Sequence, residues 1–205
     1  MKFFCAKATI SVATAIMLEE TGTAYEPVML NFAEGDQLKP EYHAINPKGR
    51  VPALVTDHGI LTETGAILEY LDTTAAAGMV PADPWAAAQM RSVMYYLAST
   101  FHVNHAHKMR GSRWADQQSS YDDMTAKVPE TMGASCAFVE DTCALSPFVM
   151  GEAITIADPW LFTICTWLAG DGVDITAYPK LSAHHDMMNA RPSVVAVRAL
   201  GLIPA

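Results

Sequence analysis

The chain has 205 residues, of which 51% are hydrophobic and 17% are charged, and this composition predicts a globular protein with a core of its own. Acidic residues outnumber basic ones by 22 to 13, which gives a net charge of −9. Because this charge repels phosphate backbones and anionic lipid headgroups, we expect neither nucleic acid nor a membrane surface as a partner.

The cysteines and the apolar segments predict a cytoplasmic protein. Cys5, Cys136, Cys143 and Cys165 form no C-x-x-C pair and no evident disulfide spacing, which favours a reducing compartment. The first apolar run ends at Lys7, short of signal-peptide length. Since no segment approaches 18 unbroken apolar residues, no membrane span is expected.

The first eighty residues alternate short strand patterns with helical patterns. In chain order the pattern predicts a strand over 2–6, a helix over 11–21, a strand over 25–30, a hairpin of strands over 53–56 and 60–62, and a helix over 64–75. The first three elements form a right-handed βαβ unit, and the rest form a ββα unit. This order is typical of a thioredoxin-like domain, although the order alone leaves other small α/β folds open.

The remainder of the chain predicts helices and almost no strand. A segment rich in proline and glycine predicts a linker over 77–84, which separates a domain over 1–76 from an all-helical domain over 85–205. One long helix is expected over 85–110, because no Pro or Gly interrupts it. Further helices are expected over 120–144, 155–169, 181–190 and 193–200, the first made irregular by Pro129 and Gly133.

Two segments of the first domain carry the functional signal. Residues 45–54 read I-N-P-K-G-R-V-P-A-L, and residues 61–71 read L-T-E-T-G-A-I-L-E-Y-L. A cis Val51–Pro52 bond would turn the valine N–H and C=O outward toward a peptide, whereas a trans loop that merely starts a strand is the alternative. Thr64 precedes an apolar helical pattern, so its hydroxyl and the first free amides favour a carboxylate, unless it is a plain helix cap.

These segments, at this spacing, resemble those of the cytosolic glutathione transferases, in particular the bacterial beta-like group. The capping segment over 151–158 resembles one in the helical domain of that family, so the resemblance extends over nearly the whole chain. It implies an enzyme of detoxification that conjugates the glutathione thiolate to a small hydrophobic electrophile entering between the domains. It also implies glutathione as co-substrate, no metal, and a homodimer.

The resemblance assigns roles in the first domain. It implies that Val51, with cis Pro52, pairs with the cysteinyl backbone of glutathione, and that Glu63 and Thr64 hold the ammonium and carboxylate of its γ-glutamyl end. Ser11, at the start of the first helix, is the first candidate for the partner of the thiolate, and Thr9 is the second. Each of these hydroxyls has a helix-cap or turn role as its alternative.

In the long helix, Tyr95, Ser99 and His102 recur at spacings that share one face. The resemblance implies that Ser99 and His102 approach glutathione and that Tyr95 and Tyr96 shape the electrophile pocket, although tyrosines at helical spacing also suit simple core packing. Three histidines at 102, 105 and 107 do not share one face and have no carboxylate near them in sequence, so no metal site is predicted.

The chain departs from the family pattern at two places. The beta-like group commonly has a cysteine where this chain has Ile10, and the family's lysine is missing from the loop over 33–36. These departures leave open a noncatalytic protein that binds glutathione or hydrophobic ligands. A glutathione-dependent isomerase, dehalogenase or peroxidase on the same fold is a further alternative, because a fold does not fix a reaction.

Overall fold

The computed structural model describes residues 1–204, which divide into two compact units. The first, here called the sheet unit, runs from Met1 to Val80 and takes in the C-terminal stretch from Asn189. The second, the helical unit, runs from Pro81 to Met188. Among the described residues, no helix is long and apolar enough to cross a membrane.

The sheet unit has the predicted thioredoxin-like order. Its strands and main helices are β1 (Lys2–Cys5), α1 (Ser11–Glu20), β2 (Glu26–Met29), β3 (Ala53–Thr56), β4 (Gly59–Thr62) and α3 (Thr64–Ala75). The sheet order is β2-β1-β3-β4, with β1 and β2 parallel and the other pairs antiparallel. The βαβ-then-ββα fold expected from the sequence is therefore confirmed.

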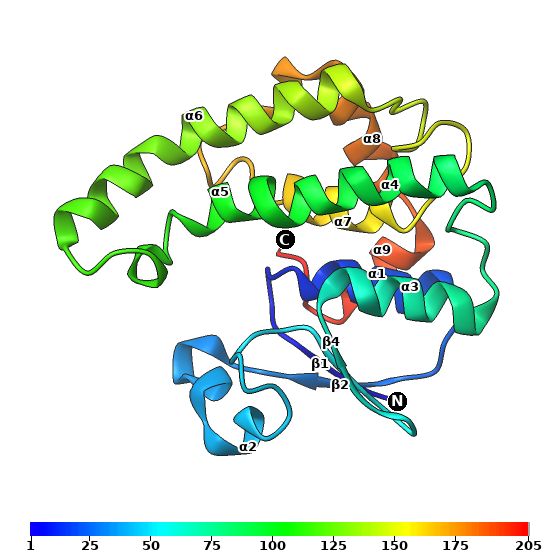
Figure 1. Cartoon of the computed structure of the whole chain (residues 1–205), viewed down its shortest axis with the longest axis horizontal. Helices are drawn as coiled ribbons and strands as arrows, with labels where there is room; N and C mark the ends of the chain where they lie inside the picture. Colours follow the sequence, from blue (N-terminus) through cyan, green and yellow to red (C-terminus); the bar gives the residue numbers. More distant parts are fainter. Residues whose placement is uncertain (205) are drawn as a thin grey trace. The chain divides into compact units, whose positions relative to one another are not determined.

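Helices α1 and α3 lie together on one face of this sheet (Figure 1). Eight of the ten residues of α1 are buried, from Ser11 to Leu18, because the helix is apolar on nearly all sides. Phe3 and Leu54 of the central strands, and Ile67 and Leu68 of α3, are fully buried in the core that results. This core fixes the strand ends that carry the candidate site.

The segment between β2 and β3 contains helical turns that the sequence patterns did not predict. They are two 3₁₀ turns, Phe32–Glu34 and Asp36–Leu38, and the short helix α2 (Pro40–His43). Elements of three or four residues are too short for a helical period to show in sequence. Their importance lies in α2, which places Tyr42 near the candidate site.

The last helix, α9 (Pro192–Ala199), packs against α1 of the sheet unit. Its Val194 and Val197 are fully buried, and the Ala8 amide donates to the Leu202 carbonyl at 2.9 Å. The predicted domain over 85–205 included this helix, whereas its contacts group it with the sheet unit. The sequence shows an apolar helical face here but not which surface covers that face.

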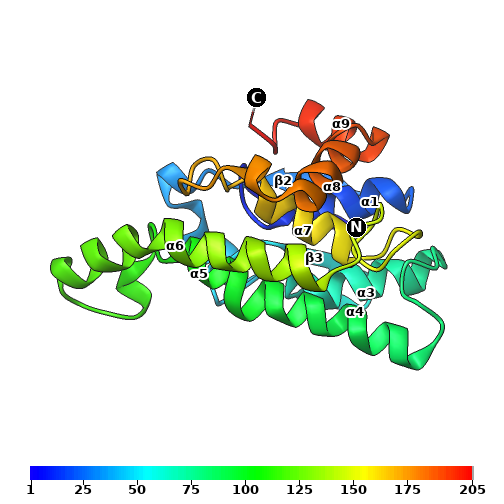
Figure 2. The same cartoon turned by 90° about the horizontal axis from the view of Figure 1, so that it is seen from above.

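The helical unit is built mainly of α-helices. They are α4 (Pro84–Tyr96), α5 (His102–Ala106), α6 (Gln118–Thr142), α7 (Ala157–Cys165) and α8 (Pro179–Asn189), with 3₁₀ turns at Gly111–Arg113 and Ile175–Ala177. Helix α6 runs alongside α4 and α5 in both Figure 1 and Figure 2. The expected all-helical second part is confirmed.

Two of the predicted helices differ from the structure. The single helix expected over 85–110 contains a π-helical stretch, Leu97–Phe101, and ends at Ala106. A π turn inserts one residue into the helix and shifts the faces on either side, a change that residue periodicity does not reveal. In contrast, α6 is one continuous helix through Pro129, because an internal proline removes one hydrogen bond without ending a helix of 25 residues.

Candidate functional site

Three chain segments meet at one end of the sheet because of the strand register. Antiparallel pairing places Ala53 opposite both Phe4 of β1 and Thr62 of β4. The residues just before β3, just after β1 and just after β4 are therefore neighbours. The Val51–Pro52 turn, the strand-to-helix turn that carries Thr9, and the start of α3 at Glu63 form one candidate site.

The Val51–Pro52 peptide bond is cis, as the sequence predicted. The carbonyl of the preceding Arg50 accepts hydrogen bonds from the Tyr42 hydroxyl at 2.5 Å and from Asn46 Nδ2 at 2.7 Å. No described residue bonds to the N–H or C=O of Val51. The turn thus fixes its own backbone through Arg50 and leaves Val51 with one donor and one acceptor for a ligand.

Tyr42 is a positioning residue that the sequence analysis missed. It is 4% exposed and packs with Ala6 and Val51 in a small apolar cluster. Burial raises the pKa of Tyr42 to about 12, so the phenol keeps its proton and donates to Arg50. Since α2 is a single turn, only the tertiary contact with Arg50 reveals this role.

Glu63 has an unusual backbone conformation at the start of α3. Its φ is +75°, in the region that side chains other than glycine rarely adopt, and such residues cluster at ligand sites. The Glu63 side chain is 71% exposed and accepts a hydrogen bond from Lys48 Nζ at 2.5 Å. A carboxylate held at this surface can receive an ammonium group.

Thr64 is the first residue of α3 and not its cap. Glu63 occupies the cap position, and no described side chain caps the helix. The first turn therefore presents backbone N–H groups that α-helical bonding cannot satisfy, at the positive end of the helix dipole. Thr64 is 7% exposed beside these amides, so the structure does not support the plain-cap alternative for its hydroxyl.

Ser11 and Thr9 form a hydroxyl pair at the strand-to-helix turn. Their oxygens are 2.7 Å apart, and Ser11 Oγ accepts from the Ala6 amide at 3.1 Å. Thr9 Oγ1 donates to the Ala6 carbonyl at 2.8 Å, and Ser11 Oγ lies 3.2 Å from the same carbonyl. Ser11 is fully buried whereas Thr9 is half-buried, so Thr9 is the hydroxyl that a ligand can reach.

Cysteine chemistry does not replace the missing thiol at Ile10. Cys5 is fully buried in β1, and burial raises the pKa of its thiol to about 12. A protonated, buried thiol is a poor nucleophile. The other cysteines are also free and buried, and desolvation raises the pKa of each thiol.

The predicted tyrosines of α4 have different surroundings. Tyr95 is 69% exposed, and its carbonyl accepts a hydrogen bond from Ser99 Oγ at 2.8 Å. Tyr96 instead packs against Phe138, with ring centroids 4.3 Å apart, and bonds to Ser135 Oγ at 3.2 Å. Tyr96 lines the cavity described next, and Tyr95 is not among the residues that line that cavity.

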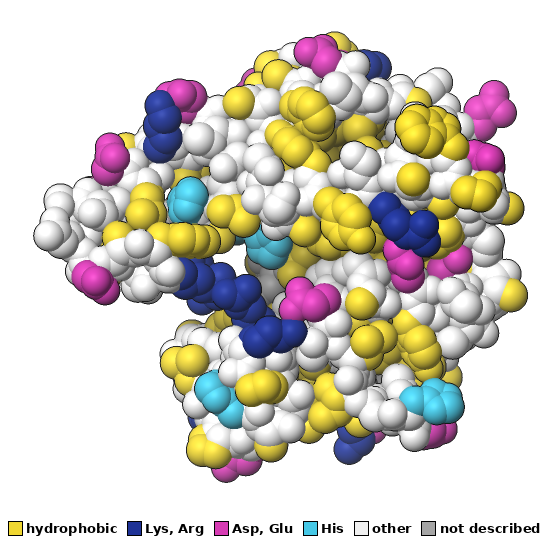
Figure 3. All heavy atoms as spheres, in the orientation of Figure 1, with side chains coloured by type: hydrophobic (Ala, Val, Ile, Leu, Met, Phe, Trp, Pro, Cys, Tyr) yellow, Lys and Arg dark blue, Asp and Glu magenta, His cyan; other side chains and the backbone are white. Residues whose placement is uncertain are grey.

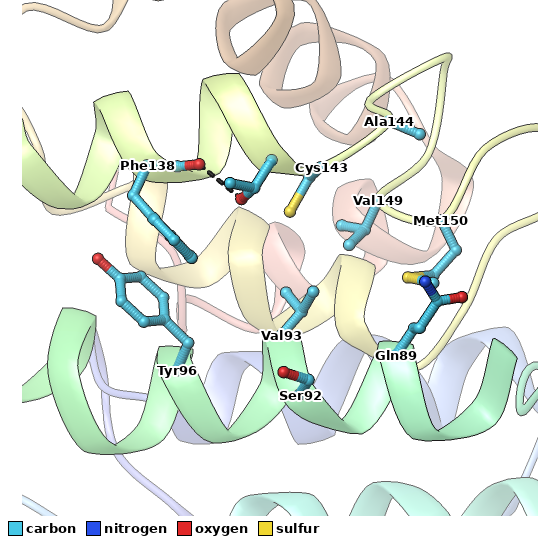
Figure 4. A pocket seen from close by; sticks show the side chains of 10 residues that line it. Gln89, Ser92, Val93, Tyr96, Phe138, Cys143, Ala144, Val149 and Met150 are labelled. Carbon is cyan, nitrogen blue, oxygen red and sulfur yellow. Dashed lines mark hydrogen bonds between the residues drawn. The ribbon is translucent and has the colours of Figure 1, made fainter. Parts of the chain in front are cut away.

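A cavity of about 510 Å³ lies beside Tyr96 within the helical unit. Figure 4 shows Tyr96 and Phe138 at one end of this cavity and Val93, Cys143 and Val149 farther along it. Because burial raises the pKa of the Cys143 thiol, the cavity holds no ready thiolate. Its lining combines apolar side chains with the polar side chains of Gln89, Ser92 and Thr142.

His102 packs against Trp167, with ring centroids 5.1 Å apart. His105, one turn later, stacks on the same indole and bonds through Nδ1 to Asp171 Oδ2 at 2.6 Å. Asp171 is 66 residues away from His105 in sequence, so no local pattern reveals this carboxylate. Among the described residues, no group of three or more His, Cys, Asp or Glu side chains is placed to hold a metal ion.

Comparison with known proteins gives a consistent result for both units. The model of the glutathione S-transferase N-terminal domain matches residues 5–73, and the model of the C-terminal domain matches residues 105–199. A solved glutathione transferase homologue from Sulfitobacter, with bound glutathione, is 58% identical with a TM-score of 0.96, and the match covers 98% of each chain.

More distant relatives include two kinds of enzyme. Glutathione S-transferase GstA of Escherichia coli O157:H7 is 26% identical over 202 residues, or 95% of each chain. A maleylacetoacetate isomerase of Pseudomonas aeruginosa is 26% identical over 193 residues, covering 91% of this chain and 90% of the relative. The similarity to both relatives therefore extends over nine tenths or more of each chain.

Proposed function

The chain belongs to the glutathione S-transferase family, and on that premise we propose that it conjugates the thiolate of glutathione to a small hydrophobic electrophile. Glutathione is the co-substrate. The proposal rests on one observation: the cis Val51–Pro52 turn lies beside the uncapped start of α3 at Glu63 and Thr64. Together these segments offer a peptide-pairing edge, an anion site and an exposed carboxylate.

Each part of the site matches one part of the tripeptide. The Val51 N–H and C=O pair with the cysteinyl backbone, because no described residue uses them. The amides and hydroxyl at Thr64 take the γ-glutamyl carboxylate, and Glu63 takes the ammonium. In the helical unit, contact of Ser99 and His102 with glutathione, and of Tyr95 and Tyr96 with the electrophile, stays a prediction.

Removing the Glu63 charge should weaken glutathione binding. We expect Glu63→Gln to raise the dissociation constant for glutathione by about 10- to 100-fold. This range corresponds to the loss of one charge-assisted hydrogen bond, which contributes about 1.5–3 kcal/mol. Glutamine keeps the length of the side chain and removes the negative charge that attracts the ammonium. Calorimetric titration with glutathione and with S-hexylglutathione measures the effect.

Glu26→Gln is the matched control, because Glu26 is an exposed acid on β2 of the same unit. It should leave the dissociation constant unchanged. If wild type and Glu63→Gln bind glutathione with equal affinity, the Glu63 carboxylate does not contribute to binding. Saturable binding by wild type without turnover of a chromogenic chloro-nitroarene would instead support a noncatalytic glutathione-binding protein.

Thr9 is proposed to donate the hydrogen bond that stabilises the thiolate, with Ser11 as its positioning residue. The Thr9 proton is directed at the Ala6 carbonyl, but Ser11 Oγ also lies within reach of that carbonyl. Ser11 can take over this bond and release the Thr9 proton toward the sulfur. A thiolate beside a donor and a helix N-terminus has a lowered pKa.

Thr9→Val should therefore lower turnover at neutral pH by about tenfold and raise the pKa of the bound thiol, since one charge-assisted hydrogen bond is lost. The ultraviolet absorbance of the thiolate, followed against pH in the complex, measures that pKa. Ser11→Ala should mainly lower stability, by about 1–2 kcal/mol, because the buried Ala6 amide loses its acceptor. If Ser11→Ala instead lowers turnover and raises the pKa of the bound thiol, and Thr9→Val mainly lowers stability, then Ser11 is the direct partner of the thiolate.

A glutathione-dependent isomerase is the second candidate, because maleylacetoacetate isomerases of Pseudomonas aeruginosa and Rhizobium meliloti are among the relatives. An isomerase regenerates glutathione, whereas a transferase consumes it. Assays that follow both the cis double bond of a maleyl substrate and the free thiol separate the two reactions. Substrate conversion at constant thiol would establish isomerisation.

A homodimer, which the resemblance implied, belongs to the same proposal. Apolar side chains reach the surface across the face drawn in Figure 3, and Trp85 and Tyr95 of α4 are 71% and 69% exposed. Exposed aromatic rings of this size are typical of contact surfaces between chains. Sedimentation equilibrium that gives the mass of one chain would contradict the dimer.

A further inference from the structure

Ala8 lies in the turn between β1 and α1, directly before Thr9, and its backbone has a left-handed conformation. Its φ is +56°, in the region that residues with a side chain rarely adopt. Ala8 is exposed, so core packing of its methyl group does not hold it in this conformation. A backbone conformation of this kind persists only where other contacts fix it.

One such contact comes from the other end of the sequence. The Ala8 amide donates a hydrogen bond to the carbonyl of Leu202 at 2.9 Å. Among the described residues, no other backbone group of Lys7 or Ala8 has a hydrogen-bond partner. Leu202 belongs to the sheet unit, as Ala8 does, so the contact is internal to the unit that carries the candidate site.

Leu202 lies in a segment that is itself held in place. This segment, residues 201–204, directly follows α9, which packs against α1. Leu202 is fully buried and Ile203 is 6% exposed. The carbonyl of Pro204 accepts a hydrogen bond from Arg198 Nη1 at 2.9 Å, which ties the segment back to α9. The Leu202 carbonyl therefore has a fixed position beside the start of α1.

Thr9 is fixed by α1 on one side and depends on Ala8 on the other. Its carbonyl accepts from the Val12 amide at 3.1 Å, and its Oγ1 accepts from the Ser11 amide at 3.3 Å. On the preceding side, the backbone angles of Ala8 set the orientation of the peptide plane that joins Ala8 to Thr9. A rotation at Ala8 would therefore move the Thr9 hydroxyl, which lies 2.7 Å from Ser11 Oγ.

We propose that the 201–204 segment positions the Thr9 hydroxyl, and that it acts through the Leu202 carbonyl on the Ala8 amide. The inference rests on the proposed role of Thr9 as donor to the glutathione thiolate, and it adds a distant determinant of that role. Without the bond to Leu202, the Ala8 backbone relaxes toward negative φ, and the Thr9 proton loses its direction toward the sulfur. The segment thus acts on the pKa of the bound thiol. The rest of the tripeptide is held at the cis-proline turn and at the start of α3.

The experiment releases the segment in the full-length chain by Leu202→Ser, because a small polar side chain does not favour burial at this position. We expect the pKa of the bound glutathione thiol to rise. Turnover of a chloro-nitroarene at neutral pH should fall by about five- to tenfold, which corresponds to a pKa rise of up to about one unit. The ultraviolet absorbance of the thiolate, followed against pH, measures the pKa.

S-hexylglutathione separates this effect from a loss of folding, because its sulfur carries no proton. Its dissociation constant should stay within about twofold of the wild-type value in Leu202→Ser, since the contacts of the tripeptide lie elsewhere in the unit. Leu200→Ser is the matched control, because Leu200 is 40% exposed and lies directly before the segment. It should change neither the pKa of the bound thiol nor turnover.

A double-variant cycle tests whether the segment acts through Thr9. In a Thr9→Val background, Leu202→Ser should lower turnover by no more than about twofold further, because the hydroxyl that the segment positions is already absent. Ala8→Gly combined with Leu202→Ser should recover turnover by about threefold, because glycine adopts positive φ without help from the segment.

Arg198→Gln provides a second way to loosen the segment, since it removes the hydrogen bond to the Pro204 carbonyl and keeps Leu202. It should raise the pKa of the bound thiol by a smaller amount than Leu202→Ser does. If Leu202→Ser fails to bind S-hexylglutathione, this variant decides the question, and an unchanged pKa in it would overturn the inference.

Other results would also contradict the inference. They are an unchanged pKa in a Leu202→Ser variant that binds S-hexylglutathione, equal losses of turnover with and without the Thr9 hydroxyl, and no recovery by Ala8→Gly. In each of these cases wild-type turnover leaves the transferase function standing. If wild type binds no glutathione or turns over no electrophile, the proposed function fails and the inference fails with it.

Discussion

Asp158→Ala is expected to lower the free energy of unfolding by about 3–5 kcal/mol, the cost of removing one member of a buried charged network. Asp158 is fully buried near the start of α7. Oδ1 accepts from the Val149 amide at 2.7 Å and from His184 Nε2 at 2.9 Å. Oδ2 accepts from the Thr155 amide at 2.7 Å and from its hydroxyl at 2.8 Å.

The size of the effect follows from the groups that the variant leaves unpaired. Each of these donors is buried, so none can turn to water when the carboxylate is removed. Asp158 also joins parts of the helical unit that are 26 residues apart, because His184 belongs to α8. Its loss should therefore weaken α8 as well as the start of α7.

Urea unfolding followed by tryptophan fluorescence measures the change in free energy. Asp141→Ala is the matched control, because Asp141 is exposed near the end of α6, and it should change stability by no more than about 0.5 kcal/mol. A similar small change in Asp158→Ala would show that the network contributes little. Asp158→Asn should give an intermediate loss, since an amide oxygen replaces only one carboxylate oxygen.

Glu20→Ala is expected to destabilise the attachment of α9 to α1 by about 2 kcal/mol, between the values for exposed and buried ion pairs. Glu20 accepts from Arg191 Nε at 2.7 Å and from Nη2 at 2.8 Å, and Ser193 Oγ donates at 2.5 Å. Its side chain is 13% exposed. Removing it takes away both hydrogen bonds between the Arg191 guanidinium and the Glu20 carboxylate.

This pair also predicts how stability depends on pH. Burial acts to raise the pKa of Glu20, but the hydrogen bonds from Arg191 and Ser193 and the charge of Arg191 outweigh it and lower the pKa. The contribution of the Glu20 carboxylate to the free energy of unfolding is therefore fully present above the pKa of glutamate in the unfolded chain, about 4.3. It is lost as the pH falls through the lower pKa of Glu20 in the folded protein. The difference in unfolding free energy between wild type and Glu20→Ala should shrink below about pH 4.

Acid-dependent unfolding of the two proteins tests this sign, and Glu26→Ala is the control for an exposed acid of the same unit. A difference that stays constant from pH 6 to pH 3 would mean that Glu20 acts through packing and not through its charge. A difference that grows toward low pH would contradict the lowered pKa.

The sequence by itself determined the order of elements and the segments of the site. The runs over 53–56 and 64–75 coincide with β3 and α3, because short apolar runs beside turn residues and a 3.6-residue period are local properties. The Val51–Pro52 turn and the helix start at Thr64 are also local features, whereas the roles of these residues and of Glu63 came from the resemblance to the glutathione transferases.

Only the tertiary structure decided which residues complete these local features. The register of β3 against β1 and β4 brings the three site segments together, and Tyr42 joins them from a helix too short for any period. Asp171 and His105 meet across 66 residues of sequence, and no local pattern records a contact of that range. The structure also shows that Ser11 is fully buried whereas Thr9 is half-buried. The sequence does not reveal this difference, because exposure depends on the whole packed chain and not on residue type.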